Sequence, residues 1–481
     1  MLRLSASLIC VLTTALLLAL SSCAVNPVTG KKELMLLSKD QEVAMGIQYN
    51  PEIIAAFGSY NDEALQNFIT QKGTEMARVS HRPELDYKFQ ILDSPVVNAF
   101  AVPGGYVYFT RGILAHFNNE AEFAGVLGHE IGHITARHSA RQYSSQILMQ
   151  GALLLGVVVS NDFAQYADVA SQGLGLLMLK FGRDHETQSD QLGVEYSTKI
   201  GYDAREMANF FNTIRRLSGD GGSVPTFLST HPDPTDRNQK VYQLANKWQQ
   251  KQPSAQFKVN RETYLRMIDG LVYGEDPRQG YLDNWTFYHP ELKFQFPVPR
   301  DWQYENTPAQ VQMAPRDGKA LLLLTIAPHR SLTDAANAIA QDTSRRVQNR
   351  QNTTVNGLPA TVLLTDQRTQ DGNTVRGLIY LIQYNDLIYK MKGLSYANDF
   401  NAWRNIFENS MSNFRPLTDS ARLNAAPERI RIKTVERDAT LEQTLRGFGM
   451  PDNRLDELAI LNGMERNTPV AKGMLIKVVG R

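Results

Sequence analysis

Apolar residues recur every three or four positions between residues 123 and 134, a spacing typical of an amphipathic helix. Asn119 stands where a helix cap is expected, and Glu122 follows three positions later, as in a capping box. Because successive helix residues advance by about 100°, His129 and His133 should lie only about 40° apart, one above the other. The pattern predicts a helix with two imidazoles on one face and an apolar stripe of Phe123, Val126, Leu127, Ile131 and Ile134.

The spacing of these two histidines suits zinc, which two imidazoles four residues apart can bind from one helix face. Glu130 falls within the apolar stripe, where burying an unpaired carboxylate is costly. A general base for a water molecule at the metal explains a carboxylate in this position. The motif His129-Glu-x-x-His133 therefore predicts one Zn²⁺ per chain, with Glu130 as the catalytic base. A helix with two hydrogen-bonded histidines and no metal is the alternative.

A second helical pattern places Glu186 and Asp190 four residues apart, hence on one face. Turned toward the paired histidines, Glu186 would supply a third zinc ligand and Asp190 a residue that orients a ligand. Two solvated carboxylates are the alternative. His138 should lie about 140° from His133 around the helix, and His185 about 100° from Glu186, so neither is expected to bind the metal.

Residues 40–49 and 61–79 carry helical patterns, and residues 87–92 alternate as a strand. Residues 98–109 indicate an edge strand, a tight turn at Gly104-Gly105 and a returning strand. An extended peptide can add to such an edge as a further strand, here beside Ala99, Phe100 and Ala101. A hairpin with a purely structural role is the alternative.

The first 22 residues contain one charge, Arg3, and the uncharged run Leu8–Leu20, whose 13 residues are too few to span a membrane. This pattern predicts a signal peptide over residues 1–22. The stretch Leu20-Ser-Ser-Cys23 resembles a bacterial lipoprotein cleavage box, with Cys23 as the lipidated first residue of the mature chain. Ala24, in place of Asp, indicates the outer membrane. An ordinary signal peptide followed by an incidental cysteine is the alternative.

The cysteine count and the charge balance of the chain limit which classes of function are plausible. The chain of 481 residues has two cysteines, and because Cys10 lies in the predicted signal peptide, Cys23 has no disulfide partner. Removing Arg3 leaves 49 basic residues against 49 acidic ones, a balance that does not favour nucleic acid as a partner.

The apolar run Ile147–Val159 is too short for a membrane span and predicts a buried helix or a lid.

The C-terminal half changes character after a linker near residues 270–280. Residues 281–416 predict an α+β module with no catalytic cluster, and residues 430–479 a strand-helix-helix-strand unit. The predicted helices of the module are Leu332–Arg350 and Asp399–Met411, and its strands include 320–327, 360–367, 374–384 and 387–395. In the terminal unit the strands are 431–435 and 474–479, and the helices 441–448 and 455–461.

The order His129-Glu-x-x-His133, Glu186-x-x-x-Asp190, His231-Pro-x-Pro-x-x-Arg237 resembles the HtpX/BepA-type zinc metallopeptidases, relatives of the CAAX prenyl proteases. The opening Asn26-Pro-Val-Thr-Gly30 resembles the periplasmic lipoproteins of that family. The resemblance covers about residues 25–275. One departure is that such proteins commonly have Glu-x-Glu-Ala-Asp, where this chain has Glu186-Thr-Gln-Ser-Asp190.

The resemblance implies a mainly helical gluzincin-type domain with zinc on His129, His133 and Glu186, and it places His231 and Arg237 near the metal as candidate catalytic residues. Three roles stay open for His231: a fourth ligand that holds the enzyme shut, a donor to the tetrahedral oxyanion, or a structural residue. Residues 281–416 weakly resemble PsbP-like domains. Residues 424–481 resemble LysM domains, which hold peptidoglycan, although a small packing domain is an equal alternative.

The sequence thus predicts a multidomain α+β protein with a signal peptide (1–22), a lipid-anchored tether (23–40), a zinc peptidase domain (41–275), an accessory domain (281–416) and a LysM-like domain (424–481). The leading hypothesis is a zinc endopeptidase, anchored through Cys23 on the periplasmic face of the outer membrane. Family resemblance implies misfolded or unassembled envelope proteins as substrates, in quality control. The alternative is a client-holding or peptidoglycan-binding lipoprotein whose zinc site is largely dormant.

Overall fold

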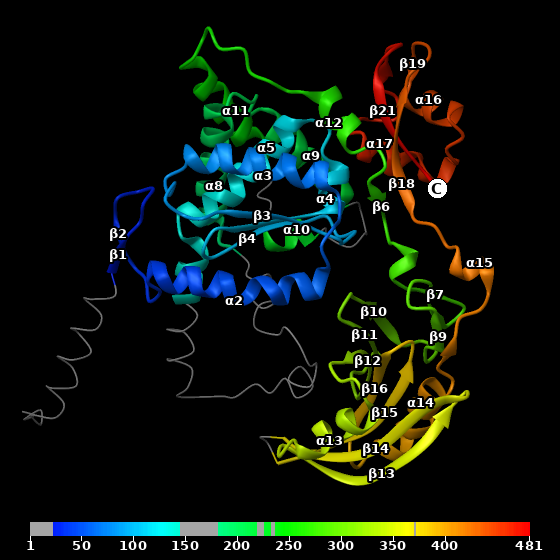
Figure 1. Ribbon diagram of the computed structural model, residues 1–481. Helices are drawn as coiled ribbons and strands as arrows, with labels where there is room; N and C mark the ends of the chain where they lie inside the picture. Colours follow the sequence, from blue (N-terminus) through cyan, green and yellow to red (C-terminus); the bar gives the residue numbers. More distant parts are fainter. Residues whose placement is uncertain (1–22, 145–180, 219–225, 232–235, 370–371) are drawn as a thin grey trace, which may run out of the picture.

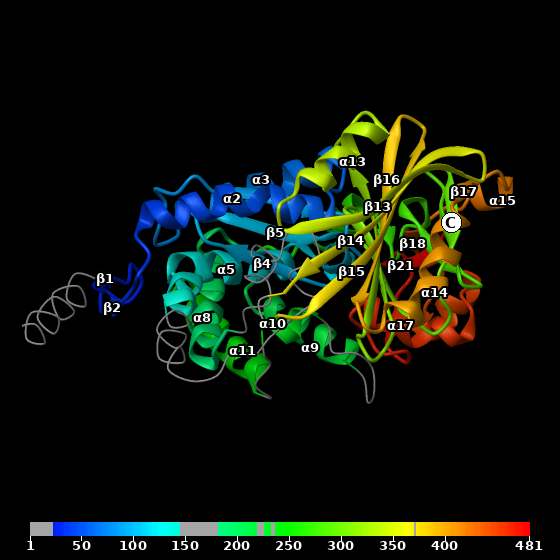
Figure 2. The same ribbon diagram turned by 90° about the horizontal axis from the view of Figure 1, so that it is seen from below.

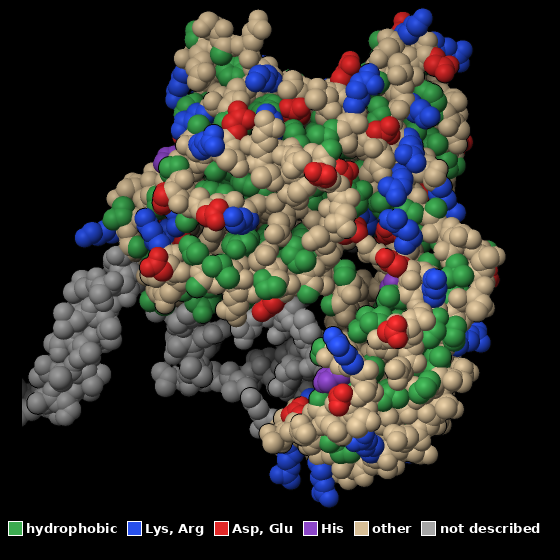
Figure 3. All heavy atoms as spheres, in the orientation of Figure 1, with side chains coloured by type: hydrophobic (Ala, Val, Ile, Leu, Met, Phe, Trp, Pro, Cys, Tyr) green, Lys and Arg blue, Asp and Glu red, His purple; other side chains and the backbone are tan. Residues whose placement is uncertain are grey.

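The computed structural model in Figure 1 describes residues 23–144, 181–218, 226–231, 236–369 and 372–481. A helical lobe and a sheet-rich lobe are joined by two chain crossings, and the face drawn in Figure 3 is hollowed where they meet. The predicted signal peptide and the apolar run Ile147–Val159 lie outside the described residues. Within the described ranges, no helix is both long enough and apolar enough to span a membrane.

The helical lobe is built on a three-stranded sheet in the order β3 (Lys88–Leu92), β5 (Tyr106–Thr110), β4 (Ala99–Val102), with β4 at an edge. Because side chains alternate between the faces of a strand, one face packs on α2 (Lys39–Phe57) and the other on α3 (Glu63–Arg78) and α5 (Glu120–Thr135). Figure 1 shows these helices on opposite sides of the sheet. The predicted strand and hairpin are confirmed.

Helix α5 begins as predicted, because the Asn119 side chain accepts the Glu122 N–H at 2.8 Å. The Glu122 carboxylate accepts the N–H of Asn118, not that of Asn119, so the cap differs by one residue from a capping box. All of α5 is buried. A Cβ on Gly128 would lie 2.9 Å from the Cα of Gly193, so paired glycines let α5 and α8 (Arg183–Lys199) touch backbone to backbone.

Around α5 lie the other named elements of this lobe, whose bounds are as follows. The helices are α4 (Arg111–His116), α9 (Glu206–Leu217), α10 (Thr226–Thr230), α11 (Arg237–Gln250) and α12 (Arg261–Met267), and β1 (Cys23–Val25) pairs with β2 (Lys32–Leu34). The β1–β2 hairpin is attached to the end of α5, since the Asn26 side chain donates to the Ala136 carbonyl at 3.4 Å.

The sheet-rich lobe centres on a seven-stranded antiparallel sheet in the order β10-β11-β12-β16-β15-β14-β13. Its helices α13 (Leu332–Gln341) and α14 (Phe400–Ser412) pack on opposite faces, since alternate residues of β15 contact one or the other (Figure 2). The strands are β10 (Gln303–Asn306), β11 (Gln310–Ala314), β12 (Ala320–Ala327), β13 (Arg345–Val355), β14 (Leu358–Arg368), β15 (Thr374–Tyr384) and β16 (Leu387–Tyr396). A smaller sheet contains β7 (Tyr281–Asp283), β8 (Thr286–His289), β9 (Phe294–Pro297) and β17 (Arg415–Pro416).

The predicted helix Leu332–Arg350 is wrong in its second half. The helix ends at Gln341, and β13 begins at Arg345 and pairs with β14 along its length. This edge strand is mostly exposed and polar, so it lacks the apolar alternation by which a strand is recognised in a sequence. Cross-strand pairing, absent from a local pattern, decides its conformation.

The terminal unit has the predicted order, with β18 (Glu428–Thr434), α16 (Leu441–Gly447), α17 (Leu455–Leu461) and β21 (Leu475–Gly480). Its sheet extends into the helical lobe, because β18 also pairs with β6 (Val272–Tyr273). One hydrophobic cluster contains residues of α5, α9 and α12 together with residues of β18, α17 and β21. The terminal unit and the helical lobe therefore share a continuous core, with α15 (Ser420–Leu423) and the pair β19 (Ala439–Thr440) and β20 (Pro469–Val470) at its margins.

Lys477 of β21 connects the terminal unit to the approach to α5. This fully buried side chain donates from Nζ to the carbonyls of Ala115 at 2.8 Å and Phe117 at 3.0 Å. Arg261 bridges the same two parts, donating to the carbonyls of Asn118 and Leu475, each at 3.1 Å. The loop that leads into α5 is thus held by β21, the last strand of the chain.

Substituting Lys477→Met should lower the thermal midpoint by several degrees. The methionine fills a similar volume but removes both hydrogen bonds, and each buried group left unpaired costs about 1–3 kcal/mol. Scanning calorimetry of the full chain measures the effect, with the exposed Lys472→Met as the matched control. An unchanged midpoint in the Lys477 variant would show that these bonds do not hold the terminal unit in place.

Candidate metal centre

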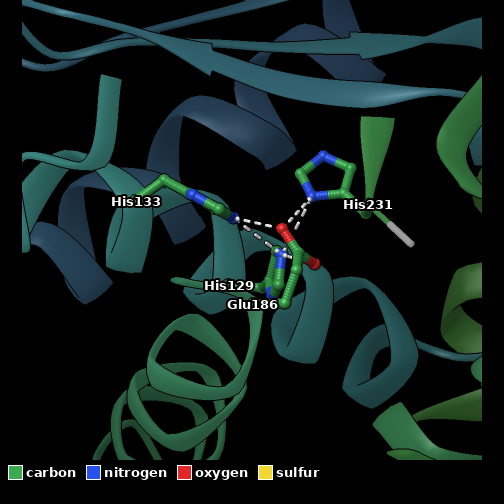
Figure 4. Close-up of side chains that lie close together, drawn as sticks. All are labelled: His129, His133, Glu186 and His231. Carbon is green, nitrogen blue, oxygen red and sulfur yellow. Dashed lines mark hydrogen bonds and ion pairs between the residues drawn. The ribbon is translucent and has the colours of Figure 1, made fainter. Parts of the chain in front are cut away.

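Four buried side chains converge at the centre of the helical lobe: His129 and His133 of α5, Glu186 of α8 and His231 directly after α10 (Figure 4). Their ligand atoms all lie within 4.8 Å of one another. The two Nε2 atoms of His129 and His133 are 3.0 Å apart, and Nδ1 of His231 lies 3.3 Å from His129 Nε2. Glu186 Oε1 lies 3.4 Å from His133 Nε2 and 3.1 Å from His231 Nδ1.

These separations match the donor set of a tetrahedral zinc ion. With Zn–N and Zn–O bonds of about 2.0–2.1 Å, neighbouring donors of a tetrahedral site lie about 3.3 Å apart. Imidazole nitrogens and one carboxylate are also the ligands that zinc prefers. The residues that the structure brings together therefore fit one zinc ion, and the predicted ligands His129, His133 and Glu186 are among them.

The protonation states of His133 and Glu186 favour metal binding. Burial lowers the pKa of His133 well below its ordinary value, so its ring stays neutral and keeps a lone pair for a metal. Burial alone would raise the pKa of Glu186, but His231, Arg237 and His129 together hold it well below the ordinary value. Glu186 is consequently ionised and can act as an anionic ligand.

Asp190 takes the position that the sequence predicts for a ligand-orienting residue, one helical turn after Glu186. Its Oδ1 accepts the Nδ1–H of His129 at 2.9 Å, which leaves the His129 Nε2 lone pair directed at the other ligands. Arg237, at the start of α11, donates to both Asp190 oxygens at 2.6 and 2.7 Å. It also pairs with Glu186 Oε2 at 3.0 Å. Arg237 thus lies behind the ligands and fixes two carboxylates at once.

Glu130 is buried to 1% exposure among these ligands. Within the described residues, neither of its carboxylate oxygens has a hydrogen-bond partner, and His231 Nε2 lies 3.6 Å from Oε1. Burial raises the pKa of Glu130, although electrostatic interactions with His231 and His129 oppose the shift. A buried carboxylate with unused acceptors and a raised pKa is well suited to accept a proton.

His138 lies closer to the site than helical geometry predicts. Helix α5 ends at Thr135 and Arg137 adopts a left-handed φ of 57°, so the chain turns back toward the metal site. His138 Nδ1 consequently lies 3.1 Å from Nδ1 of His133, and His185 stacks on the His138 ring at 4.3 Å. Neither ring belongs to the ligand set, as expected, but His138 supports His133 from behind. The end of the helix, not visible in the apolar pattern, causes the difference.

The proposed peptide edge lies beside the metal site. Thr110 N–H donates to Asn98 O, so alternate pairing along β4 and β5 leaves the peptide groups of Ala99 and Ala101 directed away from β5. The Phe227 N–H of α10 donates to Val97 O at 3.2 Å, which attaches the segment preceding His231 to this edge. Phe100 instead points to the opposite face, where it stacks on Tyr108.

Substituting Arg237→Gln should weaken zinc binding by about 10–100-fold, because Asp190 and Glu186 lose the guanidinium that fixes them. Competition with a chromogenic chelator measures the affinity. Lys240→Gln is the control, since Lys240 is largely exposed on the same helix and pairs with Asp236. Equal zinc affinity in the Arg237 variant and the parent would contradict a supporting role.

Comparison with known proteins agrees with this geometry. Residues 63–245 match the model of Peptidase family M48. The chain is 28% identical over 218 residues to the beta-barrel assembly-enhancing protease of Yersinia pestis, covering 44% of this chain and 45% of that protein. It is also 28% identical over 214 residues to the mitochondrial metalloendopeptidase OMA1 of Arabidopsis thaliana, covering 44% and 42%. The chain thus spans less than half the length of these relatives.

One solved structure bears on the predicted PsbP-like resemblance. The solution structure of PsbP from Synechocystis aligns with 29% of this chain and 91% of its own length, at 13% identity and a TM-score of 0.22. At this score the resemblance remains an expectation. The family match is firmer, because it contains His129, Glu130, His133, Glu186 and His231 in one segment. Residues 63–245 therefore resemble a domain of peptidase family M48, with the residues of the candidate metal site inside the matched segment.

Proposed function

We propose that the chain is a zinc-dependent endopeptidase. The observation that carries the proposal is Glu130, a buried carboxylate that accepts no hydrogen bond from any described residue and lies beside a zinc-like donor set. Burying a carboxylate that accepts no hydrogen bond is costly, so a purely structural or dormant site gives no reason to keep one there. His129, His133 and Glu186 would hold the zinc, as the family match supports.

The residues around the site supply the steps of peptide hydrolysis. When bound, Zn²⁺ polarises the scissile carbonyl and lowers the pKa of a coordinated water. Glu130 accepts the proton of the attacking water and later delivers it to the leaving amine. Asp190 keeps His129 in the tautomer that directs Nε2 inward, and Arg237 holds Asp190. An extended substrate adds to β4, whose outward peptide groups at Ala99 and Ala101 offer hydrogen bonds.

Substrate and location are part of the proposal. The similarity to beta-barrel assembly-enhancing proteases supports unfolded or misassembled cell-envelope proteins as substrates. The sequence around Cys23 supports lipidation and a place on the periplasmic face of the outer membrane. The LysM-like order of the terminal unit supports peptidoglycan as a further partner. Client holding without cleavage is the alternative, and Glu130 favours the enzyme.

His231 is proposed to gate the site. Its Nδ1 is among the four clustered donor atoms, so this imidazole can occupy the position that a water needs. It belongs to a short segment attached to the β4 edge through Phe227 and Val97. Displacing that segment would free both the fourth ligand position and the substrate edge.

Substituting Glu130→Gln should abolish cleavage of β-casein while zinc content and folding stay as in the parent. The amide keeps the size of the side chain but cannot accept the proton. Glu186→Gln is the contrasting variant, because a neutral amide binds zinc poorly and metal and activity should fall together. Metal analysis and casein digestion are measured on the same preparations. Cleavage at the parent rate by the Glu130 variant would refute the enzyme and favour client holding.

Substituting His231→Ala should raise basal cleavage of casein, because the fourth position becomes available to water. If His231 instead donates a hydrogen bond to the oxyanion, its removal should lower the cleavage rate by up to about 10²–10³-fold. Steady-state rates with matched zinc content separate the two roles. An unchanged cleavage rate in the His231 variant would rule out both the gating role and the oxyanion role.

A further inference from the structure

A cavity of about 520 Å³ lies between the two lobes, next to the start of the proposed peptide edge. From the helical lobe it is lined by the end of α2 and residues 93–96, and from the sheet-rich lobe by residues 280–282 and 304–308. We propose that this cavity is an exosite for an extended polypeptide that carries an aromatic or branched apolar side chain next to a basic residue. The inference rests on the proposed endopeptidase function and deepens it by naming a substrate feature.

Hydrogen bonds fix the walls of this cavity. The Asn306 side chain donates to the carbonyls of Gln279 and Gly280, at 3.0 and 3.2 Å. The Gln279 amide in turn donates to Asp93 Oδ2, and Arg111 donates from Nε to Asp93 Oδ1 at 2.6 Å. The inner end of the sheet-rich lobe is thus bonded, through one linker residue, to the segment that leads into β4. The cavity has a defined shape, as a binding site requires.

The lining offers apolar and aromatic surface at its mouth. Val96 is a large hydrophobic residue with 38% exposure, and Pro308 on the facing lobe is also exposed. Phe57, Leu282 and Tyr304 also line the cavity, and each is partly buried. The Tyr304 side chain is partly buried, and this burial raises the pKa of its hydroxyl to about 12, so the hydroxyl stays protonated. Such a surface suits an aromatic or branched apolar side chain.

The charges at the cavity are acidic. Asp93 is neutralised by Arg111 at 2.6 Å, and Asp276 by Arg278 at 2.5 Å. Glu275 and Glu305 also line the cavity, and no ion pair within the described residues engages either of them. Two uncompensated carboxylates beside apolar surface favour a basic residue in the bound polypeptide.

The cavity lies close to the peptide edge. Val96 lines the cavity, and Ala99, only three residues later, begins β4. Three residues span at most about 10 Å, so one extended polypeptide can reach both. The contact of Phe227 with Val97 lies between them, so an occupied cavity would border the segment that carries His231. A long unfolded substrate would therefore be held at two places, whereas a short peptide reaches only the edge.

Cleavage of two substrates by the full chain tests the exosite. For each variant, the ratio of kcat/KM for β-casein to kcat/KM for a six-residue fluorogenic peptide is measured. Tyr304→Ala should lower this ratio about 10-fold through KM for casein, as expected when one aromatic contact is lost. Tyr304→Phe, which keeps the ring, should restore it. Glu305→Lys, at an exposed position, should lower the ratio several-fold, most strongly at low ionic strength.

Photo-crosslinking provides a test that does not depend on turnover. A benzoylphenylalanine at position 304, in the Glu130→Gln background, should crosslink to β-casein, whereas the same group at the exposed Asn401 of α14 should not. Unchanged ratios in Tyr304→Ala and Glu305→Lys, or equal crosslinking at both positions, would overturn the exosite. Failure of the parent to cleave either substrate would instead refute the proposed endopeptidase, so the two failures are distinguishable.

Discussion

The close approach of α5 and α8 is the constraint on which the metal site depends. Gly128 and Gly193 bring the two backbones into contact, and a methyl group at Gly128 would lie 2.9 Å from the opposing Cα. Only at this separation can a short carboxylate side chain from the first turn of α8 reach imidazoles on α5. Glu186 and Asp190 then meet His129 and His133 on the facing surface. A larger residue in place of either glycine would push the two helices apart. The ligands would then be separated, although none of them would itself be changed.

The contact between α5 and α8 also brings several charged side chains together in the buried interior of the helical lobe. Glu130, Glu186 and Asp190 are all buried, and Arg237 is the arginine that compensates the last two. Buried ions are stable only when paired or bound to metal, yet within the described residues neither oxygen of Glu130 accepts a hydrogen bond, and its contact with His231 Nε2 is long, at 3.6 Å. This weakly paired carboxylate is the strongest physical reason to regard the site as catalytic. The surrounding pairs hold the ligands, and Glu130 is left available to react.

Much of the fold and the site could be predicted from the sequence, because these parts depend on patterns among residues close together in the chain. The helix around His129, its cap at Asn119 and the β4–β5 hairpin follow from spacing and turn residues within a few positions. The pairing of Glu186 with Asp190 on one face follows from the same periodicity. The helices and strands of the C-terminal unit could be predicted for the same reason, because each of them carries its own apolar pattern. These features need no knowledge of distant contacts.

Features created by distant contacts were decided only by the tertiary structure. Residues 345–350 are helix-like in sequence but form an exposed edge strand, since pairing with β14 outweighs local preference. His138 meets His133 because α5 stops at Thr135, and Lys477 joins the last strand to the loop before α5. The cavity between the lobes likewise exists only through their packing. The sequence determined which groups could act on a metal, whereas long-range packing decided what supports them and what surface lies beside them.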